Sequence, residues 1–161
     1  MDEHAAGPRL IIVCGLPGSG KTTVARALEK RLNAIRLCPD EWLQALSLDV
    51  YDEQRRAKIE TLQWDLTRRL LAHGLIVIIE WGTWGRSERD ALRMGARELG
   101  AAVELHHLHA SEQVLFERIH QRGMENPPIT REDLSHWFEI FQPPTAEESA
   151  LFDPPLLPDL I

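Results

Sequence analysis

The chain has 161 residues, of which 43% are hydrophobic, and a formal net charge of −7 at pH 7. This length fits one compact domain with a sizeable apolar core, and a second full domain is not expected. The acidic balance disfavours an extended basic surface for duplex nucleic acid, although a local basic cleft is compatible with it.

The N-terminal sequence MDEHAAGP is acidic and lacks the cationic start and apolar stretch of a secretory signal. The longest apolar runs, LIIVC and LIVII, are too short to span a bilayer. Cys14 and Cys38 lie in apolar, strand-like contexts, which predicts buried thiols rather than a disulfide or a metal site. We therefore expect a cytoplasmic protein without membrane association.

The first predicted element is a buried strand over residues 9–14, followed by the stretch GLPGSGKTT and a helix over 21–32. Three glycines and a proline between strand and helix force a sharp turn that exposes backbone N–H groups. Residues 15–22 satisfy the pattern G-x-x-x-x-G-K-[ST] in full, in the strand-to-helix context that it requires. The stretch predicts a phosphate-binding loop (P-loop).

The chemistry of such a loop is triphosphate binding. Glycines let successive N–H groups wrap a phosphate, and the positive end of the helix dipole adds to their attraction. Lys21 is expected to reach the β and γ phosphates, and the Thr22 hydroxyl to ligate Mg²⁺. We predict that the nucleotide is held by Gly15, Pro17, Gly18, Ser19, Gly20, Lys21, Thr22 and Thr23. The loop recognises phosphates only, so it leaves the base unspecified.

A second predicted strand, over 34–38, ends just before Asp40 and Glu41. The carboxyl ends of parallel strands open on one crevice, which places both carboxylates near the phosphates. Asp40 is expected to accept the proton of an attacking hydroxyl or to hold a Mg²⁺-bound water. The alternative is that Asp40 caps a short helix around 41–46, and the two roles are compatible.

A long helix is predicted after Asp52, with Gly74 as its C-terminal stop. Its apolar stripe is expected to consist of Ile59, Leu62, Leu66 and Leu70. Arg55 and Arg56 belong to a mostly solvated face, but this helix follows the Asp40 segment closely enough for either to reach an acceptor.

A third predicted strand, LIVIIE, ends in Glu80, where phosphate-loop proteins often keep a carboxylate for magnesium. Trp81 and Trp84 lie in a glycine-containing loop and are expected to line an acceptor pocket. Arg86 and Arg89 are expected to clamp an anionic group of the acceptor or to brace a lid. The alternative is ordinary edge packing, with the arginines on a solvated helix face.

The next helix is expected to have Ser87 as its N-cap and to end near Gly100, before a fourth strand over 103–108. This strand carries the sequence HHLH, in which His107 and His109 share a face. No second pair of ligands accompanies these histidines, so the pattern disfavours a metal site.

A further helix from Ser111 to Gly123 carries Arg118 and Arg122, whose i, i+4 spacing places both side chains on one face. They precede the proline-broken segment MENPPIT. This arrangement predicts a lid over residues 119–131 that closes over ATP and excludes water, with arginine charge on the transferring phosphoryl group. The alternative is a pair of surface arginines.

The C-terminal part is predicted to hold a helix from 130 to about 141 and a short helix with a capping box of Thr145 and Glu148. The tail 153–161, DPPLLPDLI, is too rich in proline for a central strand and is expected to be a surface extension. The alternation of strands and helices predicts a three-layer α/β/α fold with a mostly parallel sheet, in a single domain over 1–161.

The succession of VCGLPGSGKTT, PDEW, IIEWGTWGRSERD and LFERIHQR resembles the small P-loop kinases, which include adenylate, shikimate and gluconate kinases and chloramphenicol phosphotransferase. It looks closest to the zeta-toxin and polynucleotide-kinase-like branch, and the likeness covers residues 9 to about 152. The resemblance implies that Asp40 is the acceptor-side carboxylate. It also implies that of Arg118 and Arg122 one packs on adenine and the other touches phosphate. Two features depart from the pattern: Glu80 replaces a common Asp, and no final strand is evident in the tail.

The sequence therefore predicts an ATP-dependent kinase that moves the γ-phosphoryl group of Mg-ATP to a hydroxyl of a small molecule. One alternative is a partner-controlled P-loop NTPase without a small acceptor; a guanine-recognition segment N-K-x-D is absent. The other alternative is a 5′-hydroxyl polynucleotide kinase, in which a single-strand end enters a basic cleft. The acidic chain makes nucleic acid possible but not favoured as an acceptor.

Overall fold

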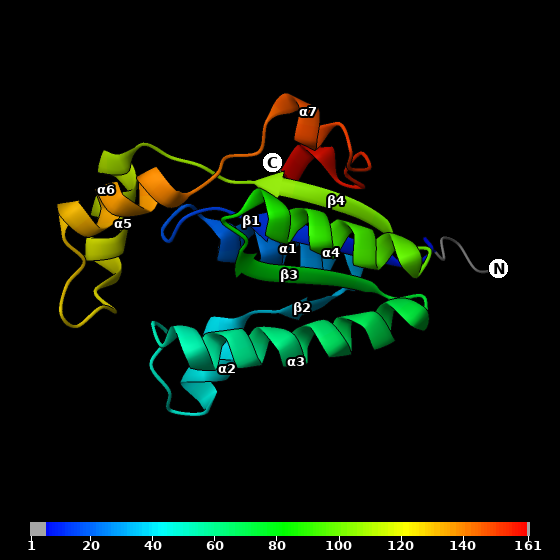
Figure 1. The fold of residues 1–161 in the computed structure, drawn as a ribbon, viewed down its shortest axis with the longest axis horizontal. Coiled ribbons are helices and arrows are strands. Elements are labelled where there is room, and N and C mark those ends of the chain that lie inside the picture. The colour runs from blue at the N-terminus through cyan, green and yellow to red at the C-terminus, as the bar shows by residue number, and fades with distance from the viewer. Residues whose placement is uncertain (1–5, 161) are drawn as a thin grey trace.

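The computed structural model describes residues 6–160 and is built around one four-stranded sheet (Figure 1). The strands are arranged in the order β2-β3-β1-β4, and all three neighbouring pairs are parallel. Their bounds are β1 (Arg9–Cys14), β2 (Ile35–Leu37), β3 (Ile76–Gly82) and β4 (Ala102–His107). The sheet is thus parallel throughout, where the sequence predicted a mostly parallel one.

Seven α-helices and one 3₁₀ helix lie within the described part of the chain. They are α1 (Lys21–Leu32), α2 (Pro39–Ala45), α3 (Glu53–Ala72), α4 (Arg86–Glu98), α5 (Glu112–Arg122), α6 (Arg131–Ile140), α7 (Ala146–Ser149) and η1 (Pro158–Leu160). None of the helices in residues 6–160 combines the length and apolar character needed to cross a membrane.

The strands are apolar on both faces because helices cover the sheet on both sides. On one face Leu10 and Ile12 of β1 pack in a cluster with residues of α3 and α4. On the other face Ile11 and Val13 pack with Ala25 and Leu28 of α1. This arrangement confirms the predicted three-layer α/β/α fold (Figure 1). The thiols of Cys14 and Cys38 are free and buried, as predicted.

The buried face of α3 differs from the predicted stripe. Leu62, expected to be buried, is 57% exposed. Ile59 is buried as predicted, and Leu66 and Leu70 are partly buried against the core, but the other fully buried positions are Gln63, Thr67 and Leu71. One of these buried positions carries an amide: the Gln63 side-chain oxygen accepts a hydrogen bond from the Trp81 indole N–H at 2.8 Å. Because the buried face of α3 includes this amide, the pattern of apolar residues in the sequence does not reveal it.

The helix ends agree with the capping signals except at α4. Ser111 caps α5 and Gly123 ends it in a left-handed conformation, as predicted. The N-cap of α4 is Gly85 and not Ser87. At α7, Thr145 accepts the backbone N–H of Glu148 at 3.1 Å. The reciprocal half of that capping box is missing, because the Glu148 carboxylate binds an arginine of α4 instead.

Residues 153–160 of the C-terminal tail pack along the flank of the sheet instead of extending away from it, although none of them is fully buried. Asp153 forms two hydrogen bonds of 2.7 Å with the backbone of Val103 in β4, one through its own N–H and one through its carboxylate. Leu157 and Leu160 pack against the apolar cluster under α1. Up to residue 160 no strand follows β4, so this tail occupies the flank of the sheet beside β4.

Helices α5 and α6 form a unit beyond the carboxyl ends of the strands (Figure 1). They pack through a separate apolar cluster that includes Leu16 of the P-loop, Leu115 and Ile119 of α5, and Leu134 of α6. This α5–α6 unit thereby faces the loops that follow β1 and β3, across the site described next.

Candidate active site

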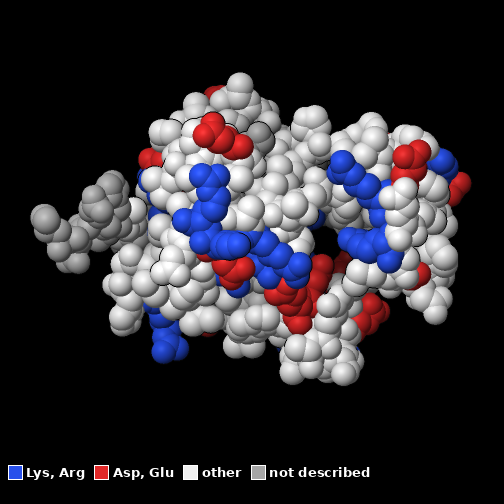
Figure 2. Space-filling model, turned by 180° about the vertical axis from the view of Figure 1, so that it is seen from behind, with Lys and Arg blue, Asp and Glu red and all other residues white. Residues whose placement is uncertain are grey.

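A cleft of about 880 Å³ opens at the carboxyl ends of the strands, between the sheet and the α5–α6 unit. Figure 2 shows this hollow, with basic side chains on both of its sides and acidic side chains along its edge. Most of the predicted site residues line it: Pro17, Gly18, Gly20, Lys21, Thr22, Thr23, Asp40, Glu80, Trp81, Trp84, Arg118 and Arg122. The fold thus brings together residues that are more than a hundred positions apart in the chain.

The P-loop makes very close contacts with neighbouring backbone. A Cβ added to Gly15 would lie 2.4 Å from the Leu108 carbonyl oxygen and 2.7 Å from the Ser19 hydroxyl, so only glycine fits there. The Gly15 N–H donates to the Gly82 carbonyl at 3.1 Å, which joins the loops after β1 and β3. Gly18 and Gly20 have φ values of 81° and 97°, a conformation that glycine adopts without strain.

Lys21 folds back on the P-loop. Its ammonium donates to the carbonyl oxygens of Gly15 at 2.9 Å and Leu16 at 3.0 Å. Burial lowers the pKa of this ammonium to about 8, although the charges of Glu80 and Asp40 oppose the shift. The side chain is therefore still mostly charged at pH 7, and a phosphate in the cleft would stabilise the charged form.

Thr22 and Glu80 supply a pair of oxygen ligands at the floor of the cleft. The Thr22 hydroxyl donates a hydrogen bond to the Glu80 carboxylate. Arg36 holds the other carboxylate oxygen at 2.8 Å and also binds Glu41 at 2.6 Å. A hydroxyl and one carboxylate are the donors that Mg²⁺ takes from a protein when phosphates and water complete its coordination, so these residues fit that ion.

Asp40 points into the cleft from the first turn of α2. Cys38 is the N-cap of α2, and the Asp40 carboxylate is bound by the Arg56 guanidinium of α3. Arg56 also binds Glu60 at 3.1 Å and the Trp81 carbonyl at 3.4 Å. The alternative role of Asp40 as a helix cap is thus wrong, and Arg56 reaches the site by holding Asp40.

The two ends of the cleft differ in charge. The P-loop end, lined by residues 17, 18 and 20–23 together with Arg118 and Arg122, carries basic groups and helix N–H groups. The α2–α3 end is lined by one arginine, Arg56, and by the carboxylates of Asp40, Glu53, Glu60 and Glu88. Burial raises the pKa of Glu60 to about 7 and also raises that of Glu88.

The predicted lid arginines both face the cleft. Arg118 donates to the Gly18 carbonyl of the P-loop at 3.2 Å. Arg122 forms an ion pair of 2.5 Å with Glu125, and the same carboxylate oxygen accepts a hydrogen bond from the Tyr51 hydroxyl at 3.1 Å. The segment after α5 is therefore joined across the cleft to the loop between α2 and α3. That these elements move as a lid stays a prediction.

The two predicted tryptophans, one at the end of β3 and one in the loop after it, differ in burial. Trp81 is almost fully buried, held by Gln63 and by the strand, and exposes one edge to the cleft. Trp84 is half-buried and packs edge-on against Trp137 and Phe141, with ring centroids 6.0 and 6.3 Å apart. Trp137 of α6 lines the cleft as well.

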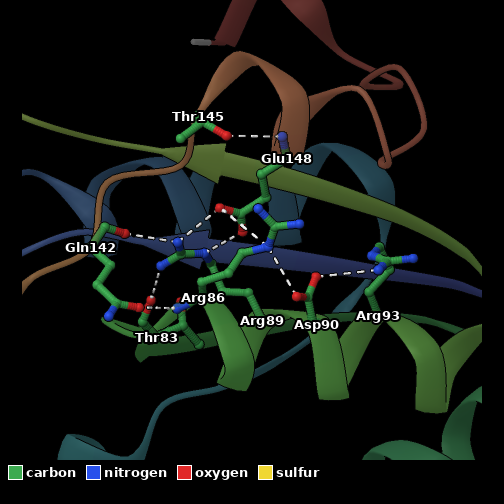
Figure 3. Close-up of polar contacts among 8 residues, drawn as sticks. All are labelled: Thr83, Arg86, Arg89, Asp90, Arg93, Gln142, Thr145 and Glu148. Carbon is green, nitrogen blue, oxygen red and sulfur yellow. Dashed lines mark hydrogen bonds and ion pairs between the residues drawn. The ribbon is translucent and has the colours of Figure 1, made fainter.

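Arg86 and Arg89 do not line the cleft, so their predicted contact with an acceptor is not supported. The Arg89 side chain is 0% exposed and is bound by the Glu148 carboxylate and two backbone carbonyls (Figure 3). The Arg86 guanidinium binds Asp90 at 2.9 Å and lies 3.9 Å from the Glu148 carboxylate (Figure 3). Because Arg89 is buried, its position agrees only with the second of its two predicted roles, that of bracing a neighbouring segment.

Ser19 and the HHLH segment belong to a second, smaller pocket of about 260 Å³ behind the P-loop. His107 lines this pocket and stacks on Phe141, with ring centroids 5.5 Å apart. His106 is buried and bonded to Glu104 at 2.7 Å. Residues 6–160 contain no group of three or more His, Cys, Asp or Glu side chains suited to a metal ion.

Several residues of the site escaped the sequence analysis. Arg36, Tyr51, Glu60 and Glu88 all shape the cleft or its floor. A charged residue inside the short strand IRL was a signal for Arg36. No local signal existed for Tyr51, whose partner Glu125 is 74 positions away.

A P-loop after the first strand of a parallel sheet, facing carboxylates from the next strands and arginines from an overlying unit, defines a P-loop NTPase of the kinase-like superfamily. The chain belongs to the AAA domain family AAA_33, whose model matches residues 10–144. No curated protein matches the sequence.

Solved structures share this fold. A gluconokinase from Sinorhizobium meliloti 1021 is 26% identical with a TM-score of 0.59, over 87% of this chain and 78% of that one. Kti12 from Chaetomium thermophilum, solved with ADP-AlF3, is 21% identical with a TM-score of 0.63, over 90% and 86%. A chain of the Pnkp1/Rnl/Hen1 RNA repair complex is 20% identical with a TM-score of 0.72, over 91% and 47%.

Proposed function

We propose that this protein is an ATP-dependent kinase that transfers the γ-phosphoryl group to a hydroxyl of a small-molecule acceptor. The observation that carries the proposal is that one cleft holds Lys21, the Thr22–Glu80 pair and Asp40 together. These are a phosphate-binding cation, a magnesium-type ligand set and a proton acceptor, the three parts that phosphoryl transfer needs.

In the proposed reaction the acceptor oxygen forms a bond to the γ-phosphorus while its proton passes to the Asp40 carboxylate. The bond from the γ-phosphorus to the β–γ bridging oxygen breaks, and ADP leaves with that electron pair. Arg56 holds Asp40 in place, and Lys21, Arg118 and Arg122 provide positive charge for the phosphate oxygens. Mg²⁺, bound through Thr22 and Glu80, would neutralise phosphate charge.

The shape and charge of the cleft support a small acceptor. Tyr51 and Glu125 join over the cleft, and carboxylates dominate its α2–α3 end. A polynucleotide would bring further phosphates to that acidic surface, where repulsion opposes binding. The gluconokinase likeness agrees with a small acceptor without identifying it.

The test is transfer of γ-labelled phosphate from Mg-ATP to a panel of aminoglycosides, nucleosides, sugars and short oligonucleotides. The blank is Lys21→Ala, and the matched control is Lys30→Ala, a lysine on the outer part of the same helix. A labelled small molecule that disappears only in the blank supports the proposal. Lys21-dependent release of free phosphate without any labelled acceptor would favour a partner-controlled NTPase, and label on oligonucleotide 5′ ends a polynucleotide kinase.

A further inference from the structure

Arg89, at the end of the first turn of α4, forms four hydrogen bonds to three separate segments, of which three are buried and the one to Gln142 is partly buried. Its guanidinium donates to the two Glu148 carboxylate oxygens at 2.6 and 3.0 Å. It also donates to the backbone carbonyls of Thr83 at 2.8 Å and Gln142 at 2.7 Å. Figure 3 shows the guanidinium between α7, the loop before α4 and the chain that follows α6. Both charged side chains are almost completely buried.

These bonds fix loop 83–86, a name we use for the connection between β3 and α4 together with the first residue of α4. Gln142 binds the same loop from its other side, donating to the Trp84 carbonyl at 2.9 Å and accepting from the Arg86 N–H at 2.8 Å. Thr83 has a φ of 47°, a left-handed conformation that a β-branched residue adopts only when its surroundings impose it. The Arg89 bond to the Thr83 carbonyl is one such constraint.

Loop 83–86 is also the part of this network that reaches the cleft. Thr83 and Trp84 line the cleft, and Trp84 packs edge-on against Trp137 of α6, which lines it too. The carbonyl of Gln142, directly after α6, is bound by the same guanidinium that binds the Thr83 carbonyl. One buried side chain therefore sets both the position of loop 83–86 and the position of the C-terminal end of α6.

We infer that Arg89, with Glu148 as its counterion, is a positioning residue for the acceptor, acting through loop 83–86 without touching substrate. This inference rests on the proposed function, which supplies the acceptor. Arginine suits this task because its planar fork presents several donors in fixed directions, so one side chain serves a carboxylate and two carbonyls. A lysine lacks that geometry. A role confined to stability would affect unfolding and leave the ligand affinities unchanged.

The test uses a double variant, Arg89→Met with Glu148→Met, because removing one partner alone would leave a buried unpaired charge and risk misfolding. Arg97→Met is the matched control, since Arg97 also ties α4 to the C-terminal region, through Asp153 at 2.7 Å, but is partly exposed and far from the cleft lining. We expect the KM for the acceptor to rise about tenfold or more, with the Kd of Mg-ATP within about twofold of the wild type. Arg97→Met should change neither.

Two results would overturn the inference. One is a lower melting temperature with KM and Kd both unchanged, which is the outcome of a purely structural ion pair. The other is an equal loss of acceptor and nucleotide affinity, which would mean that the whole cleft depends on the pair.

Failure of the proposed function can be distinguished from failure of this inference, because the order of loop 83–86 is measured without any acceptor. Hydrogen exchange of residues 81–86 and 137–142 should accelerate in the double variant, and that of the P-loop should not. The near-ultraviolet circular dichroism of the Trp84–Trp137 pair should weaken at the same time. Unchanged exchange in residues 81–86 would refute the positioning role even if the wild type phosphorylates nothing. Absence of any labelled acceptor with the wild type would refute only the kinase proposal.

Discussion

The P-loop end and the α2–α3 end of the cleft are built in different ways. The P-loop end comes mainly from one contiguous stretch of nine residues, and its binding groups are largely backbone N–H groups at a helix start. The α2–α3 end combines side chains from α2, α3 and the loop after β3. Backbone recognition leaves a fixed sequence pattern, whereas a pocket of side chains depends on packing. The first end can therefore be predicted from a short sequence pattern, and the second follows only from the folded arrangement.

The strongest test of this division removes the one side chain on which the P-loop end depends most. Lys21→Ala should lower nucleotide turnover by about a hundredfold to a thousandfold, because a preorganised charge at the phosphates is lost. Single-turnover assays with Mg-ATP measure the effect, with Lys30→Ala as control. Undiminished turnover in Lys21→Ala would remove the basis for assigning this end to the triphosphate.

Asp40→Asn tests the α2–α3 end alone. Transfer should fall by roughly a hundredfold while the Kd of Mg-ATP stays near normal, because the amide cannot take the proton but leaves the P-loop intact. Asp65→Asn, an exposed position on α3, is the control. If Asp40→Asn weakens Mg-ATP binding as much as it slows transfer, Asp40 acts at the magnesium and the two ends are not separable.

The pH dependence of binding sharpens the comparison. The pKa of Lys21 is about 8, below its ordinary value, so the free protein loses this charge as the pH rises from 7 to 9. Because bound phosphate favours the charged form, Mg-ATP affinity should weaken about tenfold over that range. Titration calorimetry measures this change. Lys21→Arg stays charged and should bind more weakly but with a flat profile, and a wild-type profile equally flat would contradict the assignment.

The smallest expected effect concerns Glu60 at the α2–α3 end. Its pKa is raised by burial from 4.5 to about 7, so the folded state binds more protons than the unfolded state between these values. The free energy of unfolding should therefore fall as the pH rises through this range. Glu60→Gln should abolish the part of this decrease that comes from Glu60. We expect a difference on the order of 1 kcal/mol between pH 4.5 and 7.5, measured by urea denaturation. Glu132→Gln, an exposed residue of α6, should keep the wild-type slope. The same slope in Glu60→Gln would show that Glu60 does not titrate abnormally.

The sequence analysis succeeded where a residue type and its local context decide the structure. Strand runs, capping residues and the P-loop located the sheet, most helix ends and the nucleotide end of the cleft. For Arg89 the sequence left two roles open, a contact with the acceptor and a brace, and the burial of its side chain agrees only with the second. The spacing of Arg89, Leu92 and Ala96 on α4 places the arginine on the buried face, and this signal was visible in the sequence.

Other features depend on partners that are remote in the chain. The amide of Gln63 is buried in α3 because it serves the indole of Trp81, and the Tyr51 hydroxyl meets a carboxylate 74 positions later. Neither pairing has a periodic signature. For the same reason the composition of the α2–α3 end, and with it the choice of acceptor, follows only from the folded arrangement.

The bond between Asp153 and Val103 has a consequence for how the protein is handled and how it assembles. An outer strand of a sheet offers unpaired backbone groups to any other chain, and natural proteins shield such strands. Here the tail shields the outer side of β4 with a proline-rich segment that cannot itself template a further strand. A chain shortened to residue 152 would expose β4 to edge-to-edge self-association, so its solubility would be lost before its nucleotide site is disturbed.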